Sequence, residues 1–127
     1  PGFEVLSAAS LPLGPAPLPT AASLSAVREA MRLWRVTTVV VPDQPGLPVY
    51  EQGRSGAYAS GFFTAVLGTL PTHVDDAWVW DRAGGAPPAA PVSAAGFTRC
   101  TTGATAASPD RLAVPVCVLA AAGRTDG

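Results

Sequence analysis

The chain has 127 residues, a net charge of −1 at pH 7 and 13% charged residues, which is about half of the usual share. It contains no lysine and its arginines are scattered, so it lacks the basic stripe that a nucleic-acid surface or a polybasic lipid site requires. No apolar run approaches the roughly 18 residues that span a bilayer. The length fits a single domain, which we expect at residues 1–122, with a frayed tail at residues 123–127.

The first predicted element is a short strand over residues 2–9, where Phe3, Val5 and Leu6 supply apolar side chains. Residues 11–19 follow, with proline at positions 12, 15, 17 and 19. Proline has no amide hydrogen and a fixed φ, so this segment cannot form a helix or a central strand. We expect an extended connector on the surface.

A helix is predicted from about residue 20 to residue 35, with Thr20 or Ser23 as its N-cap. Its apolar stripe consists of Leu24, Val27, Met31 and Trp34. Its other face carries Arg28, Glu29, Arg32 and Arg35. We interpret this charged face as solvated, although an anion-binding site is the alternative.

The β-branched run at residues 36–41 is predicted to be an interior strand that is buried on both faces and ends at Pro42. A helix that leads directly into such a strand is typical of a parallel βαβ unit. We therefore predict an α/β domain with a small, mostly parallel sheet of three to five strands, flanked by two to three helices.

The loop that follows this strand is the first candidate for a binding site, because ligands of open α/β sheets dock at the carboxyl ends of strands. Its candidate contact residues are Asp43, Tyr50, Glu51 and Arg54. The alternative is a turn-rich loop with ordinary surface charges.

A second helix is predicted from Ser55 to Leu67, with Gly68 as its stop, and a strand at residues 76–81. Trp78 and Trp80 share one face of that strand, since successive side chains alternate. Two indoles at this spacing suit stacking against a sugar, so both are candidate ligand-binding residues. Burial of the pair under a helix is the favoured alternative.

The last third of the chain is predicted to hold a hinge at residues 82–91, a helix from Ser93 to Thr101 and an edge strand at residues 112–119. Cys100 and Cys117 are expected to form a disulfide that joins this helix to the sheet. Its loop of about 17 residues corresponds to roughly 3 kcal/mol of stabilisation, and it implies an extracytoplasmic compartment. Two buried thiols are the alternative.

The sequence contains neither a glycine-rich phosphate loop nor a nucleophile elbow. Ser60, His73 and Asp75 or Asp76 would form a hydrolase triad only if they met in the fold. We assign no catalytic residue, no metal ligand and no cofactor.

Four blocks of the sequence carry a resemblance: AVREAMRLWRVTTVVVP (26–42), GFFTAVLGTLP (61–71), AWVW (77–80) and LAVPVCVL (112–119). Together they resemble the C-terminal tail of polytopic GT-C-class glycosyltransferases of high-G+C Gram-positive bacteria, which use polyprenyl-phosphate sugars. The family pattern usually has glycine where this chain has Arg35, which weakens the stop of the preceding helix. In that class the catalytic acid lies in the membrane domain, so no residue here inherits the role.

The resemblance implies a non-catalytic extracytoplasmic accessory domain of a membrane glycosyltransferase that builds cell-envelope glycan. Its expected partners are the membrane portion of its own parent chain and, in addition, cell-envelope glycan, but not nucleic acid. Three alternatives remain: a stand-alone carbohydrate-binding module, a small hydrolase, and a structural or assembly domain with no ligand.

Overall fold

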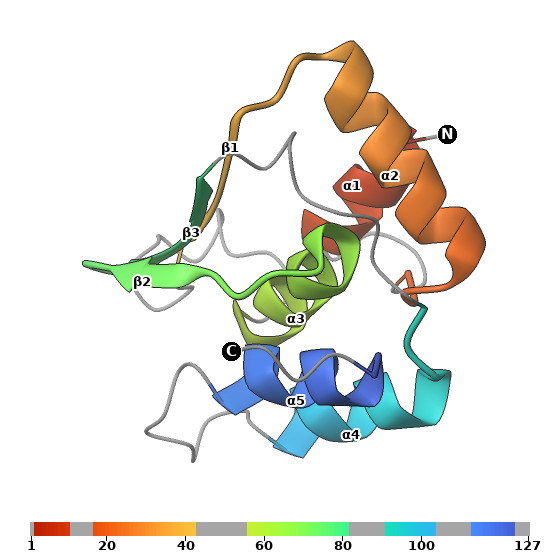
Figure 1. Cartoon of the computed structure of the whole chain (residues 1–127), viewed down its shortest axis with the longest axis vertical. Coiled ribbons are helices and arrows are strands. Elements are labelled where there is room, and N and C mark those ends of the chain that lie inside the picture. Colours follow the sequence, from red (N-terminus) through yellow and green to blue (C-terminus); the bar gives the residue numbers. More distant parts are fainter. Residues whose placement is uncertain (1, 11–16, 43–55, 82–90, 104–112, 124–127) are drawn as a thin grey trace.

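The computed structural model describes residues 2–10, 17–42, 56–81, 91–103 and 113–123. In these ranges it has the helices α1 (Gly2–Ser10), α2 (Ala21–Leu33), α3 (Gly56–Leu67), α4 (Ala94–Gly103) and α5 (Ala113–Ala121). It also has the strands β1 (Thr38–Pro42), β2 (Thr72–Val74) and β3 (Ala77–Asp81). The helix α3 lies at the centre, with α1 and α2 on one side, α4 and α5 on the other, and the sheet at one end (Figure 1). The chain is thus a mixed α/β protein.

The three strands form an antiparallel sheet in the order β1-β3-β2. The prediction of a mostly parallel sheet is therefore wrong for the part of the chain that the structure describes. The strand β1 lies at an edge of this sheet, and Val40 at its middle is 55% exposed, so the predicted interior strand is also wrong. An antiparallel sheet can keep one face on the core and the other in water, which is the pattern seen here.

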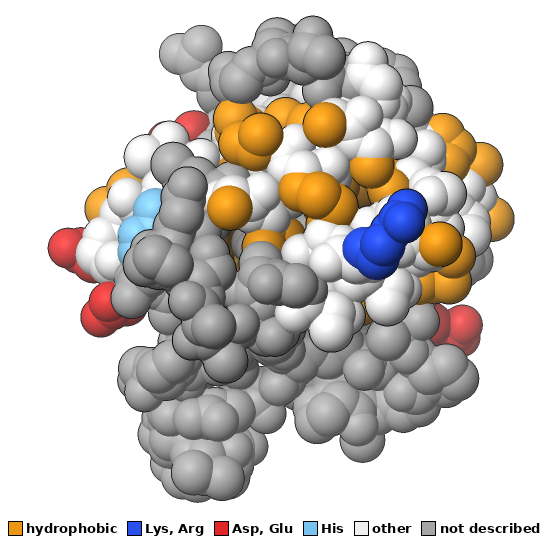
Figure 2. All heavy atoms as spheres, turned by 90° about the horizontal axis from the view of Figure 1, so that it is seen from below, with side chains coloured by type: hydrophobic (Ala, Val, Ile, Leu, Met, Phe, Trp, Pro, Cys, Tyr) orange, Lys and Arg blue, Asp and Glu red, His pale blue; other side chains and the backbone are white. Residues whose placement is uncertain are grey.

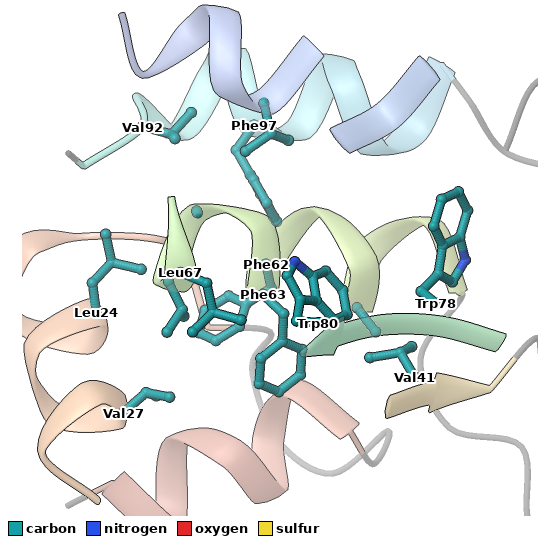
Figure 3. Packing of buried hydrophobic residues seen from close by; sticks show 14 of the residues in the cluster. Leu24, Val27, Val41, Phe62, Phe63, Leu67, Trp78, Trp80, Val92 and Phe97 are labelled. Carbon is teal, nitrogen blue, oxygen red and sulfur yellow. The ribbon is translucent and has the colours of Figure 1, made fainter. Parts of the chain in front are cut away.

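The register of β1 and β3 determines which side chains lie on the inward face of the sheet. Val39 pairs with Trp80 and Val41 pairs with Trp78 across the β1–β3 ladder. Val41 and both tryptophans are buried, and Val39 is partly buried against the same core. This face of the sheet packs on the central core around α3 (Figure 3).

The helix α3 is the centre of the hydrophobic core. Every residue from 59 to 67 is buried, including Phe62 and Val66 at 0% relative exposure. Phe63 lies 6.0 Å from Trp80 between ring centroids, and Tyr58 meets Phe97 of α4 edge-on at 5.4 Å. Figure 3 shows side chains from α2, the sheet and α4 converging on this helix. Such pairs add to the burial of large apolar surfaces, so α3 holds the other elements together.

The N-terminal segment is a helix, so the predicted strand at residues 2–9 is wrong. The reason is its contact with α2: a Cβ on Gly2 would lie 2.3 Å from the Cβ of Ala30 and 2.6 Å from the carbonyl oxygen of Ala26. Only glycine permits so close an approach of the two helices. Val5 and Leu6 are partly buried against the core in this arrangement.

The segment at residues 113–121 is also a helix, so the predicted edge strand at 112–119 is wrong. Pro115 is its third residue and lies in the first turn, where amide groups have no partner within the helix. Val114 and Val118 are buried. A Cβ on Gly61 of α3 would meet their methyl groups at 3.4 and 3.3 Å, so α5 packs closely on α3.

The helix ends follow the predicted signals. Thr20 is the N-cap of α2 and accepts a hydrogen bond from the amide of Ser23 at 3.2 Å. The Ser93 hydroxyl accepts from the amide of Gly96 at 3.1 Å at the start of α4. Gly68 stops α3 with a φ of 71°. In the described ranges, even the longest helix, α2 with 13 residues, is too short to cross a membrane.

Candidate functional site

The predicted ligand-binding residues divide into two groups. Asp43, Tyr50, Glu51 and Arg54 lie outside the residues that the structure describes. Trp78 and Trp80 lie in β3 and are only 4% and 2% exposed. The Nε1 of Trp80 donates to the carbonyl oxygen of Thr69 at 3.1 Å, and Trp78 meets His73 edge-on at 4.9 Å. Since stacking on a sugar needs an open ring face, these indoles do not offer a surface platform.

The hydrolase alternative requires an accessible serine beside the histidine. Ser60 is 0% exposed, and its hydroxyl donates to the carbonyl oxygen of Ala57 at 3.3 Å within α3. Asp75 and Asp76 form the turn between β2 and β3. A serine buried inside the central helix has no access to a substrate, so the geometry gives no nucleophilic site at Ser60.

In the described ranges, no group of three or more His, Cys, Asp or Glu side chains is placed so that it could hold a metal ion.

The predicted disulfide is present. Cys100 of α4 and Cys117 of α5 are bonded, with their Cα atoms 5.9 Å apart and their positions 17 apart in the sequence. It joins two helices rather than a helix and the sheet, because residues 113–121 are helical. Cys100 is partly buried against the core, and Cys117 is exposed. The bond thus fixes α5 to α4 on the outer side of α3.

The most distinctive surface lies at the end of α2. Leu33 is 64% exposed and Trp34, the C-cap residue, is 52% exposed. We call residues 32–35 (Arg32, Leu33, Trp34 and Arg35) the α2 corner. The prediction that Trp34 belongs to the buried stripe is wrong, because α2 ends at Leu33 and the chain then turns away. Leu24, Val27 and Met31 of that stripe are buried, as predicted.

The backbone of the α2 corner explains this exposure. Arg35 has a φ of 55°, its amide donates to the carbonyl oxygen of Arg32 at 3.2 Å, and the amide of Val36 donates to that of Met31 at 2.9 Å. This pair of bonds is the Schellman motif, in which the residue with positive φ is usually glycine.

Charge in the described ranges is unevenly placed. Three of the four described arginines, Arg28, Arg32 and Arg35, lie in or directly after the second half of α2. Arg32 donates to both carboxylate oxygens of Glu29, at 3.0 and 2.6 Å. This hydrogen bond lowers the pKa of Glu29 and raises that of Arg32. The sheet, by contrast, carries Asp75, Asp76 and Asp81.

A second exposed apolar surface lies on α5. Its sequence is apolar all around the helix, yet Ala113, Val116 and Ala120 face outward, and Val116 is 49% exposed. Figure 2 shows the molecule from the α4 and α5 side, with hydrophobic side chains gathered around one arginine. A helix that is apolar on every face is typically covered on every face.

Comparison of the chain with family models, with curated proteins and with solved structures finds no match.

Proposed function

We propose that the chain is a non-catalytic accessory domain on the extracytoplasmic face of a membrane glycosyltransferase involved in cell-envelope glycan assembly. It rests against the membrane portion of its own parent chain and helps to position an acceptor glycan there. Two independent lines support the proposal: the resemblance of four sequence blocks to such tails, and the bonded pair Cys100 and Cys117.

The disulfide is the observation that carries the proposal. Disulfides persist in oxidising compartments and are rare in the cytosol. A helix as short as α5, with nine residues, is marginal by itself, and the bond to Cys100 holds it in place. The domain therefore depends on a covalent link that an extracytoplasmic location maintains.

The proposal is tested by the location of Cys117 in cells. In the full-length parent protein, Cys100→Ala leaves an exposed Cys117 thiol, whereas the unchanged chain has both sulfurs bonded. We expect a membrane-impermeant maleimide to label the variant in intact cells and to leave the unchanged chain unlabelled. Labelling that requires cell lysis would place the domain in the cytosol and overturn the proposal.

The transferase role needs a separate measurement. In cells that make the full-length protein, removal of residues 1–127 should lower transfer of sugar to the envelope acceptor while the membrane portion stays at its normal level. Unchanged transfer would contradict an accessory role in glycan assembly.

An assembly domain with no ligand is the second candidate, and the apolar outer face of α5 favours it. In such an assembly, the outer face of α5 would pack against a neighbouring protein surface, and Val116 would be its main apolar contact. Val116→Asp should then abolish self-association or attachment of the isolated chain in sedimentation experiments. If the chain is monomeric with and without the substitution, this candidate fails.

A further inference from the structure

The α2 corner combines exposed apolar side chains with cations. Leu33 and Trp34 are adjacent and expose 64% and 52% of their surfaces. Phe3 is 67% exposed and follows Gly2, which packs on Ala30 one turn before the corner. Large apolar groups are usually scattered singly on a protein surface, so this concentration at one helix end indicates a contact.

The backbone provides a second reason to expect a role for this corner. Arg35 has positive φ at a position where glycine would avoid the steric cost that other residues incur. Residues held in such conformations are concentrated at functional sites. Arginine at this position places a positive charge at the end of the helix beside Trp34.

Charge complementarity selects the partner. Arg35 lies directly beside Trp34, and Arg32 on the other side is paired with Glu29. Asp75 and Asp76 lie in the turn between β2 and β3, away from this end of α2 (Figure 1). Tryptophan prefers the boundary between water and lipid, and arginine is attracted to anionic headgroups.

We propose that the α2 corner inserts Leu33 and Trp34 into the headgroup region of an anionic lipid bilayer, with Arg35 against the lipid phosphates. This lipid contact rests on the proposed function, because in the cell it requires that the domain is held close to a membrane. The contact itself is a property of this chain and can be measured without the parent protein. It is a shallow contact of one helix end, not an anchor.

The described tryptophans make the contact directly observable. Trp34 is exposed, while Trp78 and Trp80 are buried and give a constant background. With vesicles of phosphatidylglycerol and phosphatidylcholine in equal parts, we expect a blue shift of the chain's fluorescence, and quenching by brominated acyl chains. Both signals should disappear in Trp34→Phe, which keeps an apolar ring at the corner. Pure phosphatidylcholine vesicles should give a much smaller response.

Substitutions separate the apolar and electrostatic contributions. In co-sedimentation with the mixed vesicles, Trp34→Ser should weaken binding by about tenfold. Arg35→Gln should weaken it by about fivefold, because a cation near an anionic surface contributes a factor of roughly five. The matched controls are Val74→Ser in β2 and Arg99→Gln in α4, an exposed valine and an exposed arginine away from the α2 corner, which should leave binding unchanged.

Three results would overturn the inference: no binding to either vesicle, an equal loss in the controls, or self-association that Trp34→Ser abolishes in the absence of vesicle binding. The last result would show that the α2 corner contacts a second copy of the chain instead of lipid. Vesicle binding together with cytosolic labelling of Cys117 would keep the lipid contact and reject the proposed function. Extracytoplasmic labelling of Cys117 without vesicle binding would keep the proposed function and reject the lipid contact.

Discussion

Two valine-rich segments of the chain adopt opposite structures. Residues 38–42 (TVVVP) form the edge strand β1, and residues 113–121 (AVPVCVLAA) form the helix α5. Both segments contain three valines and a proline, and both are predicted as strands from these residues. The preference of valine for strands did not decide the structure of the second segment.

The neighbours of each segment explain the difference. The strand β1 has a partner, β3, to which all five of its residues pair. The segment 113–121 has alanine at both of its ends, and alanine is the best helix former. It also has Gly61 opposite, which lets Val114 and Val118 approach α3 closely, and a bond to α4. The propensity of a valine for strands reflects its fit to a pleated, half-buried surface, and α5 has no such surface beside it.

The largest expected effect comes from removing the bond that holds α5. Replacement of both Cys100 and Cys117 by alanine should lower the free energy of unfolding by about 3 kcal/mol, because a closed loop of this length restricts the unfolded chain. Urea denaturation followed by circular dichroism measures it. The unchanged chain in reducing buffer is the control and should show the same loss. A loss below about 1 kcal/mol would mean that packing on α3, rather than the disulfide, keeps α5 folded in its position.

A matched pair of valines compares the two segments directly. Val118 of α5 is 0% exposed, and Val40 of β1 is 55% exposed. Val118→Ala should cost about 2 kcal/mol through lost contacts and a residual cavity, even though alanine favours the helix. Val40→Ala should change stability by about 0.5 kcal/mol or less. Equal losses in thermal unfolding would contradict the assignment of one valine to the core and the other to a solvent-facing edge.

The sequence predicts those elements whose signals are local. The helices α2, α3 and α4 have a cap or a stop next to their own residues, at Thr20, Gly68 and Ser93, and all three helices are confirmed. The predicted start of α3 at Ser55 lies outside the described residues, and α2 ends two residues earlier than predicted. The strand predicted at residues 76–81 is also confirmed, and it begins one residue later, at Ala77. The failures at residues 2–9 and 112–119 depend on distant contacts: Gly2 with Ala30, and Gly61 with Val118. No window of a few residues contains that information.

The site was less predictable than the fold. The disulfide followed from cysteine number alone, and the structure confirms it. The sequence allowed two environments for Trp78 and Trp80, an exposed sugar-binding surface or the core. Only the register of β3 with β1 distinguishes them. Trp34 was assigned to a buried stripe because its spacing fits the helix, and the positive φ at Arg35 that exposes it is a property of three-dimensional structure.

Arg35 holds a backbone conformation that glycine adopts more easily. Arg35→Gly should raise the free energy of unfolding by about 1 kcal/mol, because glycine adopts positive φ without steric cost. The hydrogen bonds of Val36 and residue 35 to α2 are made by the backbone and remain. Arg35→Ala is the control, since it removes the charge without relieving the backbone, and should change stability little. A destabilised glycine variant would show that the side chain of Arg35 contributes to folding.

The smallest effect is expected from the ion pair that precedes the corner. The hydrogen bond from Arg32 lowers the pKa of Glu29 below its ordinary 4.5, so the carboxylate favours the folded state when it is ionised. This contribution is complete above pH 4.5 and disappears as the pH falls through the lowered pKa of the folded state. Both side chains are exposed, so the effect is small and sensitive to salt. Glu29→Gln should therefore match the unchanged chain in thermal unfolding at high salt, and fall slightly below it only at low salt and neutral pH. A difference that persists in high salt would mean that Glu29 has a role beyond this exposed pair.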